Sequence, residues 1–246
     1  MHLPGDGSIQ VSDVTEEFGC LALCGPDARQ VLESITDDDV SNKAFAYMTA
    51  RYIEIDGVTI WAQRISYTGE LGWELYVGVD DCLKVWDAVM RASQNFGIQT
   101  IGYKALDSLR IEKGFLYWSG DITPDDNPYA AGLGFCVDLD KGDFIGREAL
   151  LKIKAAGVSP RLCALTLDAG FGLFGGESVY ADGRLIDRIR SAAYGHSIGK
   201  DIALIYLPVD LAQPGNEVEV EVMGECIKAI VAEIPLVDPH KERVRS

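Results

Sequence analysis

The sequence predicts an α+β fold in two parts, a mixed region of helices and strands over residues 1–157 and a small all-β domain over residues 158–246. Helical and strand-like patterns alternate through the first part. Asp56-Gly57 separates two of its strands and is a strong signal for a two-residue hairpin. After Pro160, about six strand-like runs follow one another without a convincing helix, which favours a small barrel or jelly-roll-like domain.

The first part begins with a strand and a short helix. The strand covers residues 20–24 and ends at Gly25-Pro26. Asp27 is placed to cap the helix that follows, because Asp is among the preferred residues at this position. Apolar residues then recur at helical spacing, as Ala28, Val31, Leu32 and Ile35.

Further strands and helices follow in this part. Asp80 and Asp81 open a second helix, and Gly97 is a plausible stop for it. The other expected strands cover residues 51–55, 58–65, 73–77 and 98–101, and the other expected helices cover residues 103–113 and 147–155.

The second part consists of strand-like runs joined by tight turns. Asp182-Gly183 and Met223-Gly224 supply two of these turns. Glutamate and valine alternate over residues 217–222, which is typical of a strand with one wet face and one dry face. The expected strands cover residues 161–167, 177–181, 184–190, 202–207, 217–222 and 226–234.

Composition and charge exclude several classes of function. The net charge of −16 would repel a phosphate backbone, so we expect no nucleic-acid partner. No apolar run approaches the length needed to cross a bilayer, so we expect no membrane partner. The first ten residues carry no visible secretory signal. We expect a cytoplasmic protein, or one of the mitochondrial matrix if the source is eukaryotic.

The cysteines and histidines do not form a recognisable metal or redox motif. No two cysteines have Cys-x-x-Cys spacing, and most lie in apolar surroundings, so we expect buried, reduced thiols. His2, His196 and His240 are too few and too dispersed for a metal cluster. The cysteines are Cys20, Cys24, Cys82, Cys136, Cys163 and Cys226.

The densest cluster of polar and aromatic residues covers residues 66–76 and joins two strands. Tyr67 and Trp73 could stack on a flat ring. Glu74 could accept two hydrogen bonds from a heterocycle edge that offers an adjacent NH and NH2. The alternative is an ordinary hairpin with exposed acids.

Two other segments are candidates for chemistry. Asp107 and Arg110 are neighbours on a predicted helix, where Arg110 could turn toward an anionic or carbonyl group of a ligand. The alternative is a solvated ion pair. Residues 120–128 form a polar loop with three aspartates, but their spacing does not match a calcium-binding loop, so we expect a structured turn and no metal.

These three segments, in this order and spacing, resemble the aminomethyltransferase family, whose founding member is the glycine-cleavage T-protein. RISYTGELGWELYV resembles the SYTGE-x-G-x-E signature of the family, and YKALDSLRIEKGFLYWSGDITPDDNPYAAGLGFCVDLDKGDFIGREALL matches the block that follows it. Within the family, these residues most resemble the C-terminal, folate-binding half of sarcosine and dimethylglycine dehydrogenases. The resemblance continues from about residue 13 to the end of the chain.

The resemblance implies a cloverleaf of domains around a central folate pocket, two of them α+β domains on antiparallel sheets and the last a small β-barrel. It implies that Glu74 holds the pterin edge and that Tyr67 and Trp73 belong to the cofactor-binding residues. It further implies that Arg110 makes a polar contact to the folate and that Tyr194 approaches from the barrel.

The implied chemistry is capture of a methylene group on tetrahydrofolate as 5,10-methylenetetrahydrofolate. The carbon would come from a small methylated amine or its iminium, made by an FAD oxidoreductase domain outside this chain. Alternatives in the same family are a non-catalytic folate-binding protein and a folate-dependent demethylase. Because the chain is acidic and folates are anionic, local cations would be needed at the site.

The sequence also departs from the family pattern. The family's catalytic aspartate lies upstream of the strand at residues 20–24, and neither Asp6 nor Asp13 has a matching context, so no catalytic residue is assigned. A missing upstream segment would leave a sheet edge exposed, which predicts a homodimer or a disordered N-terminus. Residues 187–190 replace a strand that usually contains glycine, so an irregularity is expected there.

Overall fold

The computed structural model describes residues 5–246, except for the side chain of Ser93. His2 and the very start of the predicted disordered N-terminus lie outside these residues. Contacts divide the chain into two compact units. Unit 1 consists of Met1–Ser66, Glu70–Thr100 and Glu242–Ser246, and unit 2 consists of Tyr67–Gly69 and Ile101–Lys241. The boundary expected between residues 157 and 158 falls inside unit 2, so the contact-based units differ from the predicted domains.

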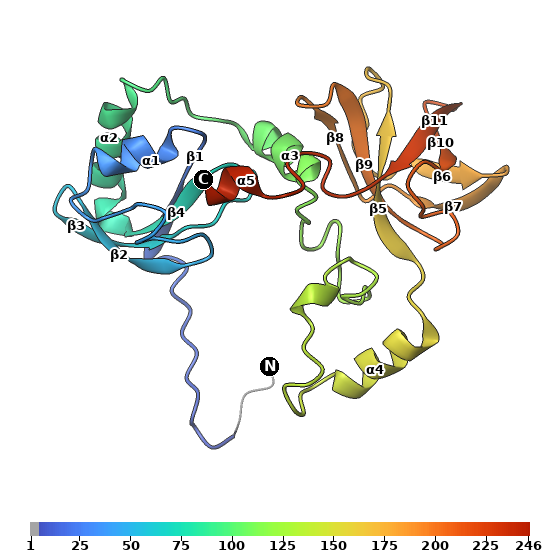
Figure 1. Cartoon of the computed structure of the whole chain (residues 1–246), viewed down its shortest axis with the longest axis horizontal. Coiled ribbons are helices and arrows are strands. Elements are labelled where there is room, and N and C mark those ends of the chain that lie inside the picture. The colour runs from blue at the N-terminus through green and yellow to red at the C-terminus, as the bar shows by residue number, and fades with distance from the viewer. Residues whose placement is uncertain (1–4) are drawn as a thin grey trace. The chain divides into compact units, whose positions relative to one another are not determined.

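Unit 1 is an antiparallel four-stranded sheet, in the order β1-β4-β3-β2, with helices α1 and α2 packed on one face (Figure 1). The turn at Asp56-Gly57 has φ values of 51° and 74°, as a two-residue hairpin requires. The elements are β1 (Phe18–Cys24), α1 (Ala28–Glu33), β2 (Ala50–Ile55), β3 (Val58–Gln63), β4 (Gly72–Gly78), a 3₁₀ turn (Val79–Asp81), α2 (Cys82–Ser93) and α5 (Glu242–Arg245). The described sheet ends at β1 and β2, and a homodimer formed through an open edge stays a prediction.

The sheet of unit 1 has one dry face and one open face. Along β4, Trp73, Leu75 and Val77 are at most 1% exposed and belong to the core beneath α1 and α2. Glu74 and Tyr76 alternate with them and are only half-buried. Because side chains alternate along a strand, both point to the face that the two helices do not cover.

Four details of unit 1 differ from the sequence-based expectation. The side chain of Asp27 makes no capping hydrogen bond. Helix α2 ends at Ser93, before Gly97. Residues 98–101 form no strand, since a β-branched pattern needs a neighbouring strand to pair with and the described structure gives them none. Helix α5 was not expected.

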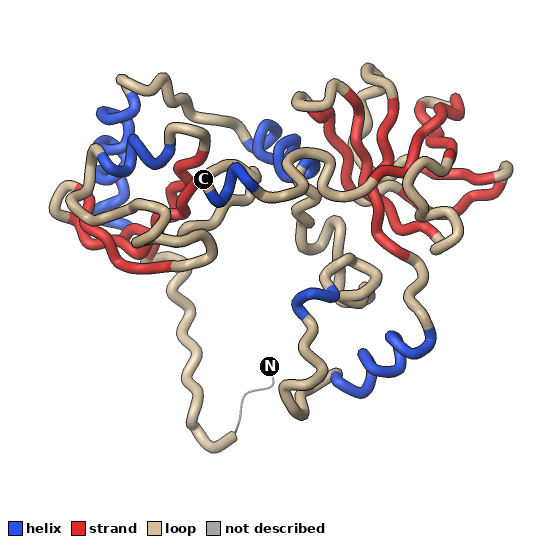
Figure 2. The backbone as a smooth tube through the Cα atoms, viewed as in Figure 1, coloured by secondary structure: helices blue, strands red, loops and turns tan. Residues whose placement is uncertain are grey.

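Unit 2 contains one seven-stranded antiparallel sheet in the order β7-β6-β10-β11-β5-β9-β8, curled into a half-barrel (Figure 2). Its helices are α3 (Tyr103–Glu112) and α4 (Arg147–Ala156), with a 3₁₀ turn at Gly134–Cys136. Its strands are β5 (Arg161–Leu167), β6 (Ser178–Ala181), β7 (Arg184–Arg188), β8 (Ser191–Gly195), β9 (Lys200–Leu207), β10 (Glu217–Val222) and β11 (Glu225–Ala232).

The run 184–190 was expected to be one strand, but β7 ends at Arg188 and β8 begins at Ser191. These two strands form opposite edges of the sheet although two residues join them. Such a short connection requires the sheet to curl until its edges approach. Ile189 in this connection is 3% exposed and turns into the barrel core, while its main-chain NH still bonds the oxygen of Glu177 at 2.9 Å.

The thiols are less buried than expected. None of the six cysteines, all of which lie among the described residues, forms a disulfide bond, and Cys20, Cys136 and Cys226 are exposed. Only Cys163 is fully buried, and burial raises its pKa to about 12. The expectation that the cysteines are buried is therefore wrong for the three exposed thiols, which lie on an open sheet face or beside turns. No helix among residues 5–246 is long and apolar enough to cross a membrane.

Candidate functional site

Glu74 lies on the open face of the sheet in unit 1. Its strand neighbours are Ala22 of β1 and Gln63 of β3. The carboxylate is half-buried, and its Oε2 atom accepts a hydrogen bond from the hydroxyl of Tyr76 at 2.9 Å. A carboxylate in this position is accessible to a ligand and already oriented by a neighbour.

Aromatic side chains border Glu74 on the same face. The register places Tyr52, Trp61, Tyr76 and Cys20 side by side on β2, β3, β4 and β1. The rings of Tyr52 and Trp61 meet edge-on with centroids 4.8 Å apart. The next row, which contains Glu74, otherwise carries only small or neutral side chains: Ala50, Gln63 and Ala22. A flat surface with one carboxylate, beside a row of rings, suits a planar heterocycle.

The hollows described in unit 1 lie away from Glu74. One runs along α2 and the segment after it, between Asp87 and Gln99. Another lies beside the β2–β3 turn, between Glu33 and Gly57. Glu74 lines neither of them.

Trp73 does not lie on the open face. Its ring is 1% exposed and meets the ring of Phe45 edge-on at 6.1 Å. The guanidinium groups of Arg29 and Arg64 lie over the same indole, 5.2 and 5.7 Å from its centroid. The expectation that Trp73 stacks on a ligand is therefore not supported, because alternation along β4 turns it into the core.

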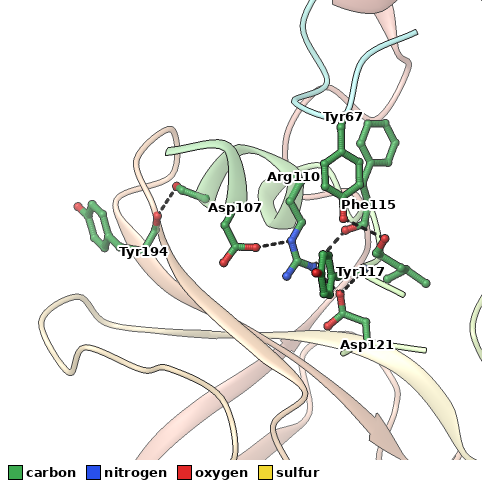
Figure 3. Close-up of polar contacts among 9 residues, drawn as sticks. Tyr67, Asp107, Arg110, Phe115, Tyr117, Asp121 and Tyr194 are labelled. Atoms are coloured by element: carbon green, nitrogen blue, oxygen red, sulfur yellow. Dashed lines mark hydrogen bonds and ion pairs between the residues drawn. The ribbon is translucent and has the colours of Figure 1, made fainter. Parts of the chain in front are cut away.

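Tyr67 belongs to unit 2, where the segment Tyr67–Gly69 packs. Its hydroxyl donates to the main-chain oxygen of Leu116 at 3.0 Å, and its ring stacks on Phe115 at 6.2 Å and 14° (Figure 3). Burial raises the pKa of Tyr67, so the phenol stays protonated and remains a donor at neutral pH.

Gly69 follows Tyr67 in a position that excludes a side chain. Its φ is +79°, and a Cβ atom there would lie 2.7 Å from Cγ and Cδ of Lys113. Lys113 cannot easily give way, since its ammonium bonds the carboxylate of Asp238 at 2.5 Å and the main-chain oxygen of the same residue at 2.8 Å. The glycine therefore lets the signature segment lie directly on this buried ion pair.

Arg110 lies at the centre of a buried network on α3. It is 2% exposed, its Nε atom bonds Asp107 at 2.6 Å, and its Nη1 atom bonds the fully buried Asp121 (Figure 3). Nη1 also donates to the main-chain oxygen of Phe115 at 3.2 Å. The alternative of a solvated ion pair is therefore wrong. The Nη2 atom has no hydrogen bond within the described residues, so it is the donor left for a ligand.

Two of the three aspartates in the loop over residues 120–128 have structural roles. One oxygen of Asp121 accepts bonds from Arg110 and from the main-chain NH of Tyr117 at 2.7 Å, while Oδ1 has no partner among the described residues. Asp126 closes a local turn with Thr123 at 2.8 Å. The described residues contain no group of three or more side chains that could hold a metal ion.

Tyr194 lies on β8 and is 40% exposed. Its ring meets His196 edge-on at 4.8 Å, and its main-chain oxygen accepts a bond from the hydroxyl of Ser108 at 2.6 Å. Figure 3 shows the rings of Tyr194 and Tyr67 on opposite sides of Arg110. Tyr67 therefore lies closer to Arg110 than Tyr194 lies to either of these two residues.

The sequence analysis gave no role to three tyrosines near the candidate residues. Tyr76 bonds Glu74, and this contact could have been predicted, because side chains two residues apart on a strand point to the same face. Tyr103 and Tyr117 share a hydrogen bond that raises the pKa of Tyr103, and both lie near Arg110. No local pattern indicated the second pair, because one residue lies on α3 and the other in the following loop.

The chain has an antiparallel α+β unit followed by a curled β-sheet, and Glu74 lies on the open face of the first sheet. These features are those of the glycine-cleavage T-protein class. The GCVT N-terminal domain model matches residues 1–141, and the glycine cleavage T-protein C-terminal barrel domain model matches residues 161–238. The chain belongs to this family. The two matched ranges lie on either side of the boundary predicted at residue 157, which itself stays a prediction.

The chain is similar to longer proteins of two kinds. It is 39% identical to the mitochondrial dimethylglycine dehydrogenase of Homo sapiens, over 98% of this chain and 28% of that protein. It is 39% identical to the mitochondrial sarcosine dehydrogenase of Mus musculus, over 96% of this chain and 27% of that protein. It is 34% identical to the aminomethyltransferase of Symbiobacterium thermophilum, over 95% of this chain and 63% of that protein.

A solved structure has the same fold. The aminomethyltransferase T of the glycine cleavage system from Bartonella henselae aligns with a TM-score of 0.80 and 28% identity, over 90% of this chain and 60% of that one. The chain spans a little over a quarter of the length of the two dehydrogenases.

Proposed function

We propose that this chain binds tetrahydrofolate and takes part in one-carbon transfer to it. The observation that carries the proposal is the carboxylate of Glu74, accessible on an open sheet face and bordered by the rings of Tyr76 and Trp61. A pterin presents an adjacent NH and NH2, and a carboxylate offers two oxygens at matching spacing. The residues present therefore fit the pterin edge.

In this proposal Glu74 fixes the pterin edge. The family resemblance also implies roles in folate binding for Tyr67, Arg110 and Tyr194. Arg110 would use its remaining donor, Nη2, without leaving its two carboxylates. Tetrahydrofolate supplies the two nitrogens that accept the methylene carbon. The contribution of the chain is to hold and orient the reactants, so proximity provides much of the rate.

The proposed donor is a small methylated amine or its iminium, oxidised by an FAD oxidoreductase domain outside this chain. The names of the dimethylglycine and sarcosine dehydrogenases, and their much greater length, support this proposal. We propose a cytoplasmic or mitochondrial-matrix location on the same ground, since both of those relatives are mitochondrial by name.

A non-catalytic folate-binding protein is the second candidate. Asp6 and Asp13, the acids nearest the start, are fully exposed and close local turns with Ser8 and Thr15. Those hydrogen bonds lower the pKa of both carboxyls and give each acid a local structural role. No catalytic acid is therefore assigned in this chain.

A titration of the full 246-residue chain with tetrahydrofolate tests the proposal. We expect Glu74→Gln to weaken binding by at least about tenfold, because a charge-assisted pair of bonds becomes a neutral one that also presents an NH2 to the ligand. Glu221→Gln is the matched control, since Glu221 is also bonded by a tyrosine, at 2.8 Å, but on the barrel.

The same chain is then supplied with formaldehyde, or with the iminium from a separate amine oxidase, and methylene transfer is measured above the uncatalysed rate. Transfer supports the first candidate, and binding without transfer supports the second. Absence of tetrahydrofolate binding overturns both.

A further inference from the structure

We propose that Tyr76 is a positioning residue for Glu74, one that fixes its carboxylate to receive a two-donor heterocycle edge; this inference rests on the proposed function. Tyr76 follows Glu74 by two residues on β4, so the two side chains share a face. The tyrosine hydroxyl donates to Oε2 at 2.9 Å.

The ring of Tyr76 is held by its neighbours across the sheet. Trp61 of β3 lies directly opposite on one side and Cys20 of β1 on the other. The Cys20 thiol and the Tyr76 hydroxyl also interact through a hydrogen bond. A ring confined on both sides presents its hydroxyl from a fixed point, unlike a tyrosine that stands alone on a surface.

The hydroxyl stays a donor under all ordinary conditions. Its bond to Glu74, together with burial, raises the pKa of Tyr76 well above that of a free phenol. Glu74 therefore faces an O–H donor at neutral pH.

This hydrogen bond restricts the orientation of the carboxylate and leaves most of its acceptor positions open. A carboxylate has about four acceptor positions on its two oxygens, so one bond from Tyr76 leaves Oε1 and the second position of Oε2 for a ligand. A free glutamate side chain must lose rotamer freedom when it binds a ligand. Tyr76 removes part of that loss before the ligand arrives, which is preorganisation.

The chain contains a second tyrosine–glutamate pair for comparison. Tyr180 of β6 donates to Oε2 of Glu221 at 2.8 Å, across two strands of the barrel. Glu221 belongs to the expected wet face of its strand and has no proposed ligand. Tyr180→Phe therefore removes the same type of hydrogen bond and serves as a matched control for Tyr76→Phe.

The test measures dissociation constants of the full chain for tetrahydrofolate and for its 2-desamino-2-methyl analogue, which lacks the exocyclic donor. Four proteins are compared: wild type, Tyr76→Phe, Tyr180→Phe and Glu74→Gln. We expect Tyr76→Phe to raise the dissociation constant for tetrahydrofolate by about three- to tenfold, a typical effect for one hydrogen bond to a charged group that is partly exposed. The analogue should be affected less than twofold, and Tyr180→Phe should change neither value.

The outcomes separate the inference from the proposed function. If Glu74→Gln weakens tetrahydrofolate binding and Tyr76→Phe does not, the inference is wrong and the function stands. If Tyr76→Phe weakens both ligands equally, the hydroxyl has a merely structural role and the inference is also wrong. If Glu74→Gln leaves binding unchanged, the proposed function and the inference fail together. Thermal unfolding of each variant shows whether the fold is retained.

Discussion

The guanidinium of Arg64 bonds the main-chain oxygen of Ser246 at 2.8 Å, although 182 positions separate the two residues. It also donates to the main-chain oxygens of Phe45 at 2.7 Å and Val244 at 3.3 Å. Arg29 donates to the same Ser246 oxygen at 2.6 Å. Two arginines therefore fasten the segment Glu242–Ser246 onto unit 1 through its main chain.

Arg64 is buried, and none of its hydrogen-bond partners within the described residues is an Asp or Glu side chain. The guanidinium of Arg64 is fully buried, and burial with the charge of Arg29 lowers its pKa to about 10. It stays protonated at neutral pH, and main-chain carbonyls with the face of Trp73 solvate it. The cost of burying the charge is thus offset by several bonds at once.

Replacing this arginine should unfold unit 1 more easily. We expect Arg64→Ala to reduce the free energy of unfolding by about 3 kcal/mol or more, since it leaves several buried carbonyls without a donor. Urea titration of Trp73 fluorescence measures the loss. Arg91→Ala is the control: its ion pair with Asp56, at 3.3 Å, is largely exposed and should contribute at most about 0.5 kcal/mol. Equal losses in the two variants would contradict the role given to Arg64.

The Arg110 network should be important to unit 2 independently of any ligand. Arg110→Met leaves the fully buried Asp121 without its cation, which typically costs about 3–5 kcal/mol. The control is Lys228→Met, because the Lys228–Glu217 pair at 2.5 Å is exposed and should change stability by less than about 0.5 kcal/mol. Chemical unfolding followed by circular dichroism measures both. A loss of folate binding with unchanged stability would instead identify Arg110 mainly as a ligand contact.

Gly69 should tolerate no side chain. We expect Gly69→Ala to cost about 2–3 kcal/mol, from a positive φ and from overlap with the pinned side chain of Lys113. Gly132→Ala separates the two causes: Gly132 has a φ of +73° but open space around it, so only the backbone strain of about 1 kcal/mol applies. Thermal unfolding of both variants gives the comparison, and an equal shift would show that the contact with Lys113 contributes nothing.

Stability should fall at alkaline pH because of the buried thiol of Cys163. Its folded pKa is raised to about 12 from an ordinary value of 9.0, so the folded state holds the proton more tightly. The resulting stability is fully present below about pH 9 and is lost as the pH rises toward 12. At pH 10.5 the loss should reach about 2 kcal/mol, at 1.36 kcal/mol per pKa unit.

Urea titrations of wild type and Cys163→Ala between pH 8.5 and pH 10.5 measure this effect. The variant should show a flatter dependence on pH, whatever its stability at neutral pH. Cys226→Ala is the control, because that thiol is exposed. A slope unchanged by Cys163→Ala would show that other groups, such as Tyr206, whose pKa burial raises to about 12, account for the whole decline.

The sequence by itself determined what depends on local pattern. The strand expected over residues 73–77 is β4, and the Asp56-Gly57 pair forms the predicted hairpin turn between β2 and β3. The three segments, in their order and spacing, were sufficient to recognise the family, which the matched domain models confirm. These features rest on side-chain periodicity and on backbone angles that only a few residues adopt.

Only the tertiary structure decided which way each side chain turns and what it meets. Trp73 and Glu74 are adjacent in the signature, yet pairing with β1 and β3 buries one and exposes the other. The sequence favoured a surface ion pair for Arg110 over a ligand contact, and only the structure shows that the buried Asp121, eleven residues later in the chain, bonds it in the interior. Burial and long-range ion pairs arise from contacts between segments far apart in the chain, and no local pattern specifies them.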